Sequence, residues 1–229
     1  MQQIPLHIEL KEDATFDNYI VGDNDILLAQ LQAIAPLQQE FIYLYGDSGS
    51  GRSHLLQALA QQYSEHYPQS LIAYLPLDNT MLVPQMLDGL SEFDCVCLDG
   101  FEAVTGDQEW ETAIFNLYNS FKDGGKSLVI TGLEAPAYLK TYLPDLKSRL
   151  SAMFIHAIKP LSDQDKLQFL SNKAQQRGLE LSEDVAQFLL SRQQRDLPSL
   201  NHLLERLDHA SLQAKRRLTI PFVKQVLDA

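Results

Sequence analysis

The fold of this chain is decided by the stretch FIYLYGDSGSGRS at residues 41–53. Its first five residues are aromatic or aliphatic, which predicts a buried strand over Phe41–Tyr45. Three glycines follow at positions 46, 49 and 51, and a helical stretch over Ser53–Tyr67 comes next. Glycines let a backbone curl so that its N–H groups point inward, and the start of a helix adds positive potential. The stretch therefore predicts a phosphate-binding loop between a strand and a helix.

The loop fits the P-loop pattern G-x-x-x-x-G-K-[ST], with Arg52 in the position of the lysine. A planar guanidinium prefers two-point contacts, so we expect phosphate binding to be retained and rapid transfer of a γ-phosphate to be impaired. Ser53 supplies a hydroxyl for Mg²⁺. The alternative, a glycine-rich turn without a ligand, does not explain three glycines at this spacing. The predicted nucleotide-binding residues of the loop are Gly46, Ser48, Gly49, Ser50, Gly51, Arg52, Ser53 and His54.

An acidic residue ends a second apolar stretch. Asp99 follows Cys95–Leu98, which is the form of a Walker B strand, and its carboxylate would bind Mg²⁺ through water. The next residue is Gly100, where AAA+ ATPases usually carry an acid that orients the attacking water. Glu102 could replace that acid, or it could be solvated or paired with a neighbour, and we favour the second interpretation. We therefore expect weak or absent intrinsic ATPase activity.

Apolar and helical stretches alternate along the first 160 residues. The expected strands are Phe41–Tyr45, Leu71–Leu75, Cys95–Leu98, Leu128–Thr131 and Phe154–Ile158, and the expected helices are Ser53–Tyr67, Met81–Leu90 and Asp107–Lys122. The strands are rich in Val, Ile, Tyr and Phe with little polar alternation, which is typical of a parallel sheet covered on both faces. The pattern predicts an α/β fold of the AAA+ P-loop type with a parallel five-stranded sheet.

After Pro160 the pattern is helical only. Four helices are expected, and their predicted caps are Ser162 (in a capping box with Asp165), Ser182, Asp196 and Thr219. We therefore expect three parts: an extended N-terminal arm over residues 1–15, an α/β nucleotide-binding domain over residues 16–160, and an all-helical lid domain over residues 161–229.

The composition argues against direct binding to nucleic acid. Lys and Arg number 18 against 30 Asp and Glu, so the net charge is −12, whereas a DNA-binding face is basic. The densest basic cluster, Lys215–Arg217, fits a solvated helix end. Cys95 and Cys97 fit buried thiols in a reducing compartment. Because Met1–Pro5 does not resemble a signal peptide and no apolar stretch reaches membrane-spanning length, we expect a cytoplasmic protein without a membrane contact.

Five stretches resemble the DnaA family of bacterial replication initiators and span nearly the whole chain. They are Ala14–Asn24, His54–Leu56, Leu128–Thr131, Leu143–Leu150 and Thr219–Val223. The resemblance implies that Ile20, Val21 and Gly22 lie beside the nucleotide base and that Thr131 is the sensor I residue.

Two further positions matter for the reaction that this resemblance implies. Arg149 matches an arginine finger, which acts on nucleotide held by a neighbouring molecule, although it could instead be a surface arginine paired with Asp145. Pro198 stands where the family usually carries its sensor II arginine, and the placement of Arg192 and Arg195 is open. The missing sensor again argues against efficient hydrolysis by this chain.

DnaA would continue after the lid into a DNA-binding domain, which we do not expect here, and the chain is acidic; in this it resembles the Hda family, regulatory relatives of DnaA. That family has an N-terminal peptide that docks on the DNA polymerase sliding clamp, and Gln3, Ile4, Leu6 and Ile8 take its place here. The resemblance implies a regulator that binds ADP, or another nucleotide, with Mg²⁺. Its partners would be DnaA and the sliding clamp, whereas the sequence leaves open whether the chain also forms a homo-oligomer.

This regulator would stimulate hydrolysis of DnaA-bound ATP and so prevent repeated initiation. It would supply an arginine finger without being an enzyme itself. An autonomous AAA+ ATPase, such as a helicase loader, is the main alternative, and steady-state ATP turnover would distinguish the two. A small-molecule P-loop kinase fits less well, because the long helical tail does not resemble a short basic lid.

Overall fold

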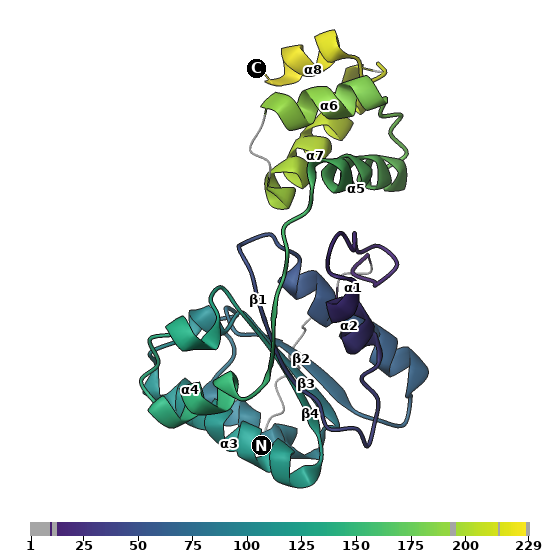
Figure 1. The fold of residues 1–229 in the computed structure, drawn as a ribbon. Coiled ribbons are helices and arrows are strands. Elements are labelled where there is room, and N and C mark those ends of the chain that lie inside the picture. Colours follow the sequence, from purple (N-terminus) through teal and green to yellow (C-terminus); the bar gives the residue numbers. More distant parts are fainter. Residues whose placement is uncertain (1–9, 11–12, 193–195, 215, 228–229) are drawn as a thin grey trace. The chain divides into compact units, whose positions relative to one another are not determined.

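The computed structural model describes residues 10, 13–192, 196–214 and 216–227, and it divides the chain into two compact units. The first unit spans residues 1–158 and the second spans residues 159–229. The division lies after Ile158, whereas the sequence analysis placed it after Pro160. The first unit contains the sheet with its helices, and the second contains helices (Figure 1).

The first unit is built on a five-stranded parallel sheet, as predicted. Its strands are β1 (Phe41–Tyr45), β2 (Ile72–Pro76), β3 (Cys95–Asp99), β4 (Ser127–Gly132) and β5 (Phe154–Ala157), in the order β2-β3-β4-β1-β5. In the register, Tyr45 is paired with Gly132 and Leu98 with Ile130. The P-loop, Asp99 and Thr131 therefore meet at the carboxyl edge of the sheet, where ligands bind in open α/β sheets.

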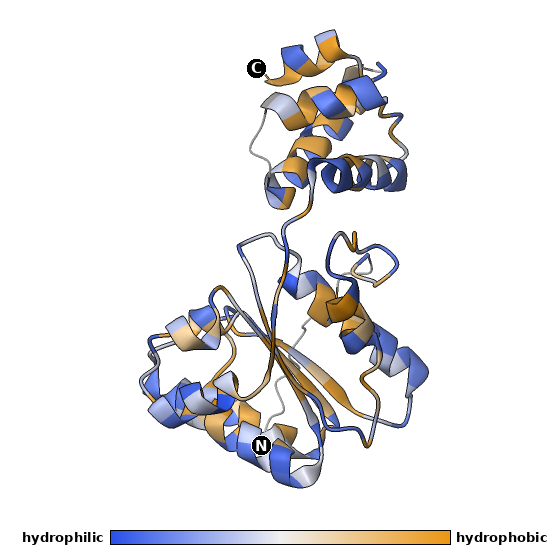
Figure 2. Cartoon of the chain, in the orientation of Figure 1, coloured by the Kyte–Doolittle hydropathy of each residue, from blue (hydrophilic) through white to orange (hydrophobic). Residues whose placement is uncertain are grey.

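Helices cover both faces of the sheet (Figure 1). On one face, α1 (Asp25–Gln32) and α2 (Arg52–His66) pack on Ile42 and Leu44 of β1. On the other face, α3 (Gln108–Gly124) and α4 (Pro144–Ser151) pack with the 3₁₀ helix η1 (Pro84–Glu92) and with Tyr43. Successive strand residues thus point to opposite cores, and hydrophobic residues run along the strands and the inner sides of the helices (Figure 2).

The last strand differs from its prediction. It was expected to be buried, but Phe154 and Ile155 are 61% and 42% exposed. The reason is its place at the end of the strand order, where its one neighbour in the described sheet is β1. Its apolar residues therefore reflect strand propensity more than burial.

One helical prediction also needs correction, and two helices of the first unit were not predicted. The helix expected over Met81–Leu90 is the 3₁₀ helix η1, which begins at Pro84. Helix α1 had no prediction. Helix α4 had no prediction either, and it begins at Pro144, because proline is well tolerated at the first position of a helix.

One buried carboxylate fixes the start of α4. The side chain of Glu111 is fully buried on α3 and accepts hydrogen bonds from the backbone N–H groups of Gly106 (2.7 Å), Tyr142 (3.0 Å) and Leu143 (2.7 Å). Leu143 is the residue before α4, so Glu111 ties the helix that carries Arg149 to α3. Three N–H donors satisfy a buried carboxylate that would otherwise be costly.

The second unit is all-helical, as predicted, with α5 (Asp163–Gln176), α6 (Glu183–Arg192), α7 (Leu197–Ala214) and α8 (Ile220–Leu227). The predicted capping box is present, since Ser162 and Asp165 bond reciprocally. Asp196 accepts from the N–H of Ser199 (2.8 Å) and so caps α7, which tolerates Pro198 in its first turn. Within the described residues, no helix is long and apolar enough to cross a membrane.

Candidate nucleotide-binding site

The P-loop takes the conformation that its glycines predict. Gly49 and Gly51 have positive φ angles of 77° and 96°, which other residues adopt only with strain. Gly46 is needed for space, because a Cβ there would lie 2.8 Å from Ser50 Oγ. Gly51 is the N-cap of α2 and offers no side chain to the first N–H groups of the helix. These groups are thus left for another acceptor, and a phosphate suits them.

The N-terminal segment packs on this loop. The Tyr19 ring lies so close that a Cβ on Gly51 would be 2.9 Å from its Cε2 atom, and its centroid is 5.7 Å from that of the His54 ring. His54 Nε2 also lies 2.7 Å from the carbonyl oxygen of Thr15. Burial raises the pKa of Tyr19 to about 12, so its hydroxyl is neutral. Ile20, Val21 and Gly22, the residues expected beside the base, follow directly after Tyr19 in the chain.

The arginine of the P-loop has a partner within the chain. Arg52 Nη1 donates to Glu102 Oε1 at 2.8 Å, with side chains that are 12% and 30% exposed. The second interpretation of Glu102, pairing with a neighbour, is therefore correct. The other carboxylate oxygen, Oε2, is buried and has no hydrogen-bond partner within the described residues. The carboxylate is thus held by the cation of the loop and is not free to orient water.

Asp99 lies in a network at the end of β3 and is 7% exposed. Tyr74 donates its hydroxyl to Oδ2 of Asp99 (2.7 Å), and Thr131 donates to Oδ1 (2.6 Å) while accepting from the N–H of Gly100 (2.9 Å). Burial, and then the charge of Asp99, raises the pKa of Tyr74 well above its usual range, so this hydroxyl stays a donor.

The residues present fit a magnesium site of the expected kind. Ser53, which is exposed in the first turn of α2, and Asp99 provide the oxygen ligands that Mg²⁺ prefers. Each oxygen of Asp99 already accepts one bond from the protein and keeps one lone pair free. The site therefore suits a metal held through water better than one bound directly.

Arg149 lies on α4, away from the P-loop in sequence, and its partners are aromatic. Its guanidinium carbon is 5.9 Å from the centroid of Phe115 and 5.8 Å from that of Tyr118. Among the ion pairs of the described residues there is none between Arg149 and Asp145. Arg149 takes part in none of the ion pairs that the described residues form, so the pair of the alternative interpretation is not seen there.

Several predicted residues fall outside the described residues or belong to the second unit. The clamp-binding residues Gln3, Ile4, Leu6 and Ile8 fall outside the described part of the chain, and so does Arg195. Pro198 is in α7 of the second unit, and Arg192 is the last residue of α6.

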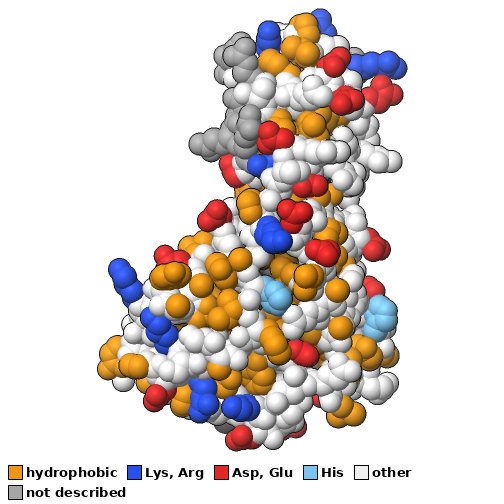
Figure 3. All heavy atoms as spheres, in the orientation of Figure 1, with side chains coloured by type: hydrophobic (Ala, Val, Ile, Leu, Met, Phe, Trp, Pro, Cys, Tyr) orange, Lys and Arg blue, Asp and Glu red, His pale blue; other side chains and the backbone are white. Residues whose placement is uncertain are grey.

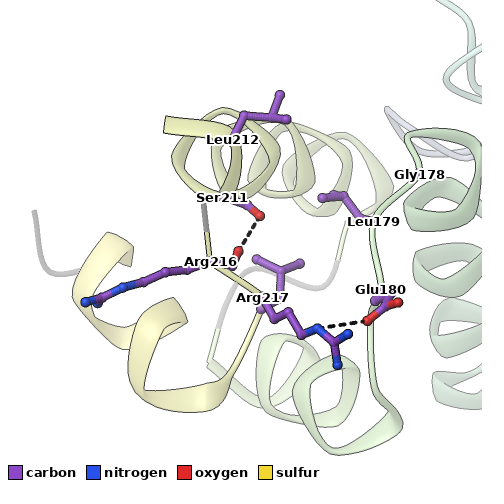
Figure 4. A pocket seen from close by; sticks show the side chains of 8 residues that line it. Gly178, Leu179, Glu180, Ser211, Leu212, Arg216 and Arg217 are labelled. Atoms are coloured by element: carbon purple, nitrogen blue, oxygen red, sulfur yellow. Dashed lines mark hydrogen bonds and ion pairs between the residues drawn. The ribbon is translucent and has the colours of Figure 1, made fainter. Parts of the chain in front are cut away.

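The second unit has a surface pocket of its own, of about 380 Å³, beside the predicted basic cluster (Figure 4). It lies between the α5–α6 connection and the end of α7, where Arg217 is 3.5 Å from Glu180. These side chains are 85% and 75% exposed, and such pairs contribute little. Basic side chains are scattered, not gathered, on the face shown in Figure 3.

Two residues of the P-loop site were missed in the sequence. Tyr19 was part of a family stretch but carried no role, and Tyr74 lay within an expected strand. Gln57 of α2 donates to the Tyr74 hydroxyl (3.1 Å), which links the helix after the P-loop to the Asp99 network. The available signal was Tyr74 itself, a tyrosine in β2, the strand beside β3. Its partner, Asp99, is determined only by the register of the two strands.

Strand order, P-loop, Asp99 on the third strand and a helical second unit together define an AAA+ protein. Two families match the sequence: the bacterial DnaA ATPase domain over residues 10–157, and the lid domain of Hda over residues 163–227. The first match covers more than half of the chain. The chain therefore belongs to the bacterial DnaA ATPase domain family, and it carries an Hda-type lid.

Solved structures share this fold. Domain III of the replication initiation protein DnaA from Thermotoga maritima is 21% identical, with a TM-score of 0.86 over 96% of this chain and 98% of that one. AMPPCP-bound DnaA from Aquifex aeolicus is 20% identical, with a TM-score of 0.69 over 90% and 69%. The RuvB Holliday junction branch migration motor from Thermotoga maritima is 14% identical, with a TM-score of 0.62 over 82% and 61%.

Proposed function

We propose that this chain is a nucleotide-binding regulator of replication initiation that stimulates hydrolysis of ATP bound to DnaA. It binds ADP, or another adenine nucleotide, with Mg²⁺ in its own P-loop. It engages the sliding clamp through its N-terminal arm and presents Arg149 to the nucleotide of the partner.

The observation that carries this proposal is the contrast between the two arginines. Arg52 is paired with Glu102 inside its own site, whereas Arg149 rests on two aromatic rings without an acidic partner in the described residues. A guanidinium can contact two oxygens of a transferring phosphoryl group at once. The decisive experiment mixes the chain with loaded clamp and ATP-bound DnaA and follows conversion of the DnaA-bound nucleotide to ADP.

Intrinsic ATP turnover is expected to be slow, well below the typical enzyme value of about 10 s⁻¹. Gly100 supplies no carboxylate, and Glu102 is held by Arg52, so no described acid of this site is placed to orient water. Steady-state phosphate release from the purified chain measures the rate. Turnover near that value, lost on Asp99→Asn, would favour the alternative of an autonomous AAA+ ATPase.

Clamp binding is expected to depend on the arm. Replacing Gln3, Leu6 and Ile8 by Ala should abolish retention on immobilised clamp, since an extended peptide binds through a polar anchor and spaced aliphatic side chains. Gln2→Ala with His7→Ala is the matched control on the same arm and should bind as the native chain does. Undiminished binding by the triple variant would remove the arm from the mechanism.

A further inference from the structure

Glu102 forms an ion pair with Arg52, whose positive charge a nucleotide phosphate would need. We infer that Glu102 competes with phosphate for the Arg52 guanidinium, and that this competition sets the nucleotide affinity of the site and its dependence on a divalent cation. The inference rests on the proposed nucleotide site and adds to it a residue that tunes binding. No bond is made or broken in this role, because Glu102 acts only through its charge.

The geometry places this pair within the phosphate site itself. Arg52 is the first residue of α2, directly after Gly51, and Glu102 follows β3 in the one-turn helix Phe101–Ala103. Their contact at 2.8 Å therefore joins the P-loop to the end of the Walker B strand. The charges of both residues affect the pKa of the Tyr43 hydroxyl on β1. Burial raises this pKa most, the charge of Glu102 raises it further, and the charge of Arg52 lowers it. Since Arg52 comes after β1 and Glu102 after β3, the pair lies at the carboxyl edge of the sheet.

Only half of the Glu102 carboxylate is satisfied. Oε1 accepts from Arg52, while Oε2 is buried and without a hydrogen-bond partner in the described residues. A carboxylate in this position depends on Arg52 for its compensation. Removing one partner of such a pair leaves a charge that is poorly solvated, which is more costly than the pair is favourable.

Either response to an arriving phosphate weakens its binding. If Arg52 stays with Glu102, the phosphate meets a neutralised cation and a nearby negative charge. If Arg52 turns to the phosphate, Glu102 loses its counterion while a second anion approaches. In both cases the like charge of Glu102 lowers the affinity, and a neutral side chain of the same shape would remove the penalty.

A divalent cation is the component that would relieve this penalty. Mg²⁺ bound to the phosphates brings positive charge to the side of the site where Asp99 and Glu102 lie, and carboxylate oxygens with free lone pairs accept hydrogen bonds from its bound waters. The affinity of the native chain for ADP should therefore increase strongly with Mg²⁺. Without Glu102 the increase should be smaller, because one of the charges that Mg²⁺ compensates is gone.

The test compares ADP affinity by calorimetry in EDTA and in Mg²⁺, using the native full chain, Glu102→Gln and Glu109→Gln. The glutamine at position 102 keeps an oxygen for Arg52 but no charge. In EDTA we expect Glu102→Gln to bind about tenfold more tightly than the native chain, and its gain on adding Mg²⁺ to be smaller. Glu109, exposed at the start of α3, controls for the same change in net charge and should leave both affinities as in the native chain.

Equal or weaker binding by Glu102→Gln in EDTA overturns the inference while leaving the nucleotide site intact. If Glu102→Gln and Glu109→Gln increase the ADP affinity equally, the inference is overturned too, because the effect would then be one of net charge. If no variant binds ADP with or without Mg²⁺, the proposed nucleotide site is wrong and the inference with it. Thermal unfolding checks each variant, and Glu102→Ala replaces Glu102→Gln if the latter does not fold.

Discussion

The variant Arg149→Ala should no longer stimulate hydrolysis of DnaA-bound ATP, although it should still fold, bind nucleotide and bind the clamp. An arginine finger supplied in trans is worth about 10³–10⁵ in rate in other phosphoryl-transfer systems. This corresponds to roughly 4–7 kcal/mol of activation free energy. The contacts of Arg149 with the rings of Phe115 and Tyr118 are worth only about 0.5–2 kcal/mol. A loss of the larger size therefore reports on the partner's reaction and not on the stability of α4.

The measurement is the fraction of DnaA-bound ATP converted to ADP with time, in the presence of loaded clamp. Lys147→Ala is the matched control, because it removes a positive charge from the same helix together with a hydrogen bond to the carbonyl oxygen of Leu139. It should retain most of the stimulation. If Arg149→Ala stimulates as well as the native chain, the finger lies elsewhere or the regulator acts by displacing nucleotide.

Gly51→Asp should abolish nucleotide binding, with a loss of at least about 100-fold in affinity. Three effects act together at this position. The φ angle of 96° strains any side chain, a Cβ would lie 2.9 Å from the Tyr19 ring, and the new carboxylate would repel phosphate at the start of α2. Calorimetry with ADP in the presence of Mg²⁺ measures the loss.

Gly125→Asp controls for the strain and the charge of this substitution. Gly125 also has a positive φ angle, of 68°, but a Cβ there meets nothing within 4 Å and the residue ends α3 far along the chain from the P-loop. It should bind ADP as the native chain does, at some cost in thermal stability. Equal affinity for the native chain and Gly51→Asp would show that the phosphates do not lie on this loop.

Most of the fold could be predicted because its signals are local. The stretch at residues 41–53 fixed one strand, one loop and one helix, and the apolar stretches gave the other strands to within a residue or two of their observed ends. Caps at Ser162 and Asp196 gave two helix starts of the second unit. Each of these features depends on residues only a few positions apart.

The features that were not predicted depend on where elements lie in the folded chain. Phe154 and Ile155 have the composition of a buried strand, but whether a strand lies at the centre or the edge of a sheet depends on the strand order. Helix α4 was not predicted, although Pro144 has a favourable place at the start of a helix. Glu111 had no predicted role, because two of its three backbone donors come from a distant part of the chain.

By itself, the sequence determined the class of site: a P-loop with arginine in place of lysine, an acid at the end of the third strand, and a glycine after it. These are properties of residue type and spacing, and no packing is needed to recognise them. Only the tertiary structure decided which partners each charged side chain contacts. In the folded chain Arg52 pairs with Glu102, which is 50 positions away in the sequence. Asp99 accepts hydrogen bonds from Tyr74 and Thr131, and Arg149 lies over aromatic rings. The physical reason is that electrostatic partners are chosen by distance in space, which strand register and helix packing set and which sequence separation does not record.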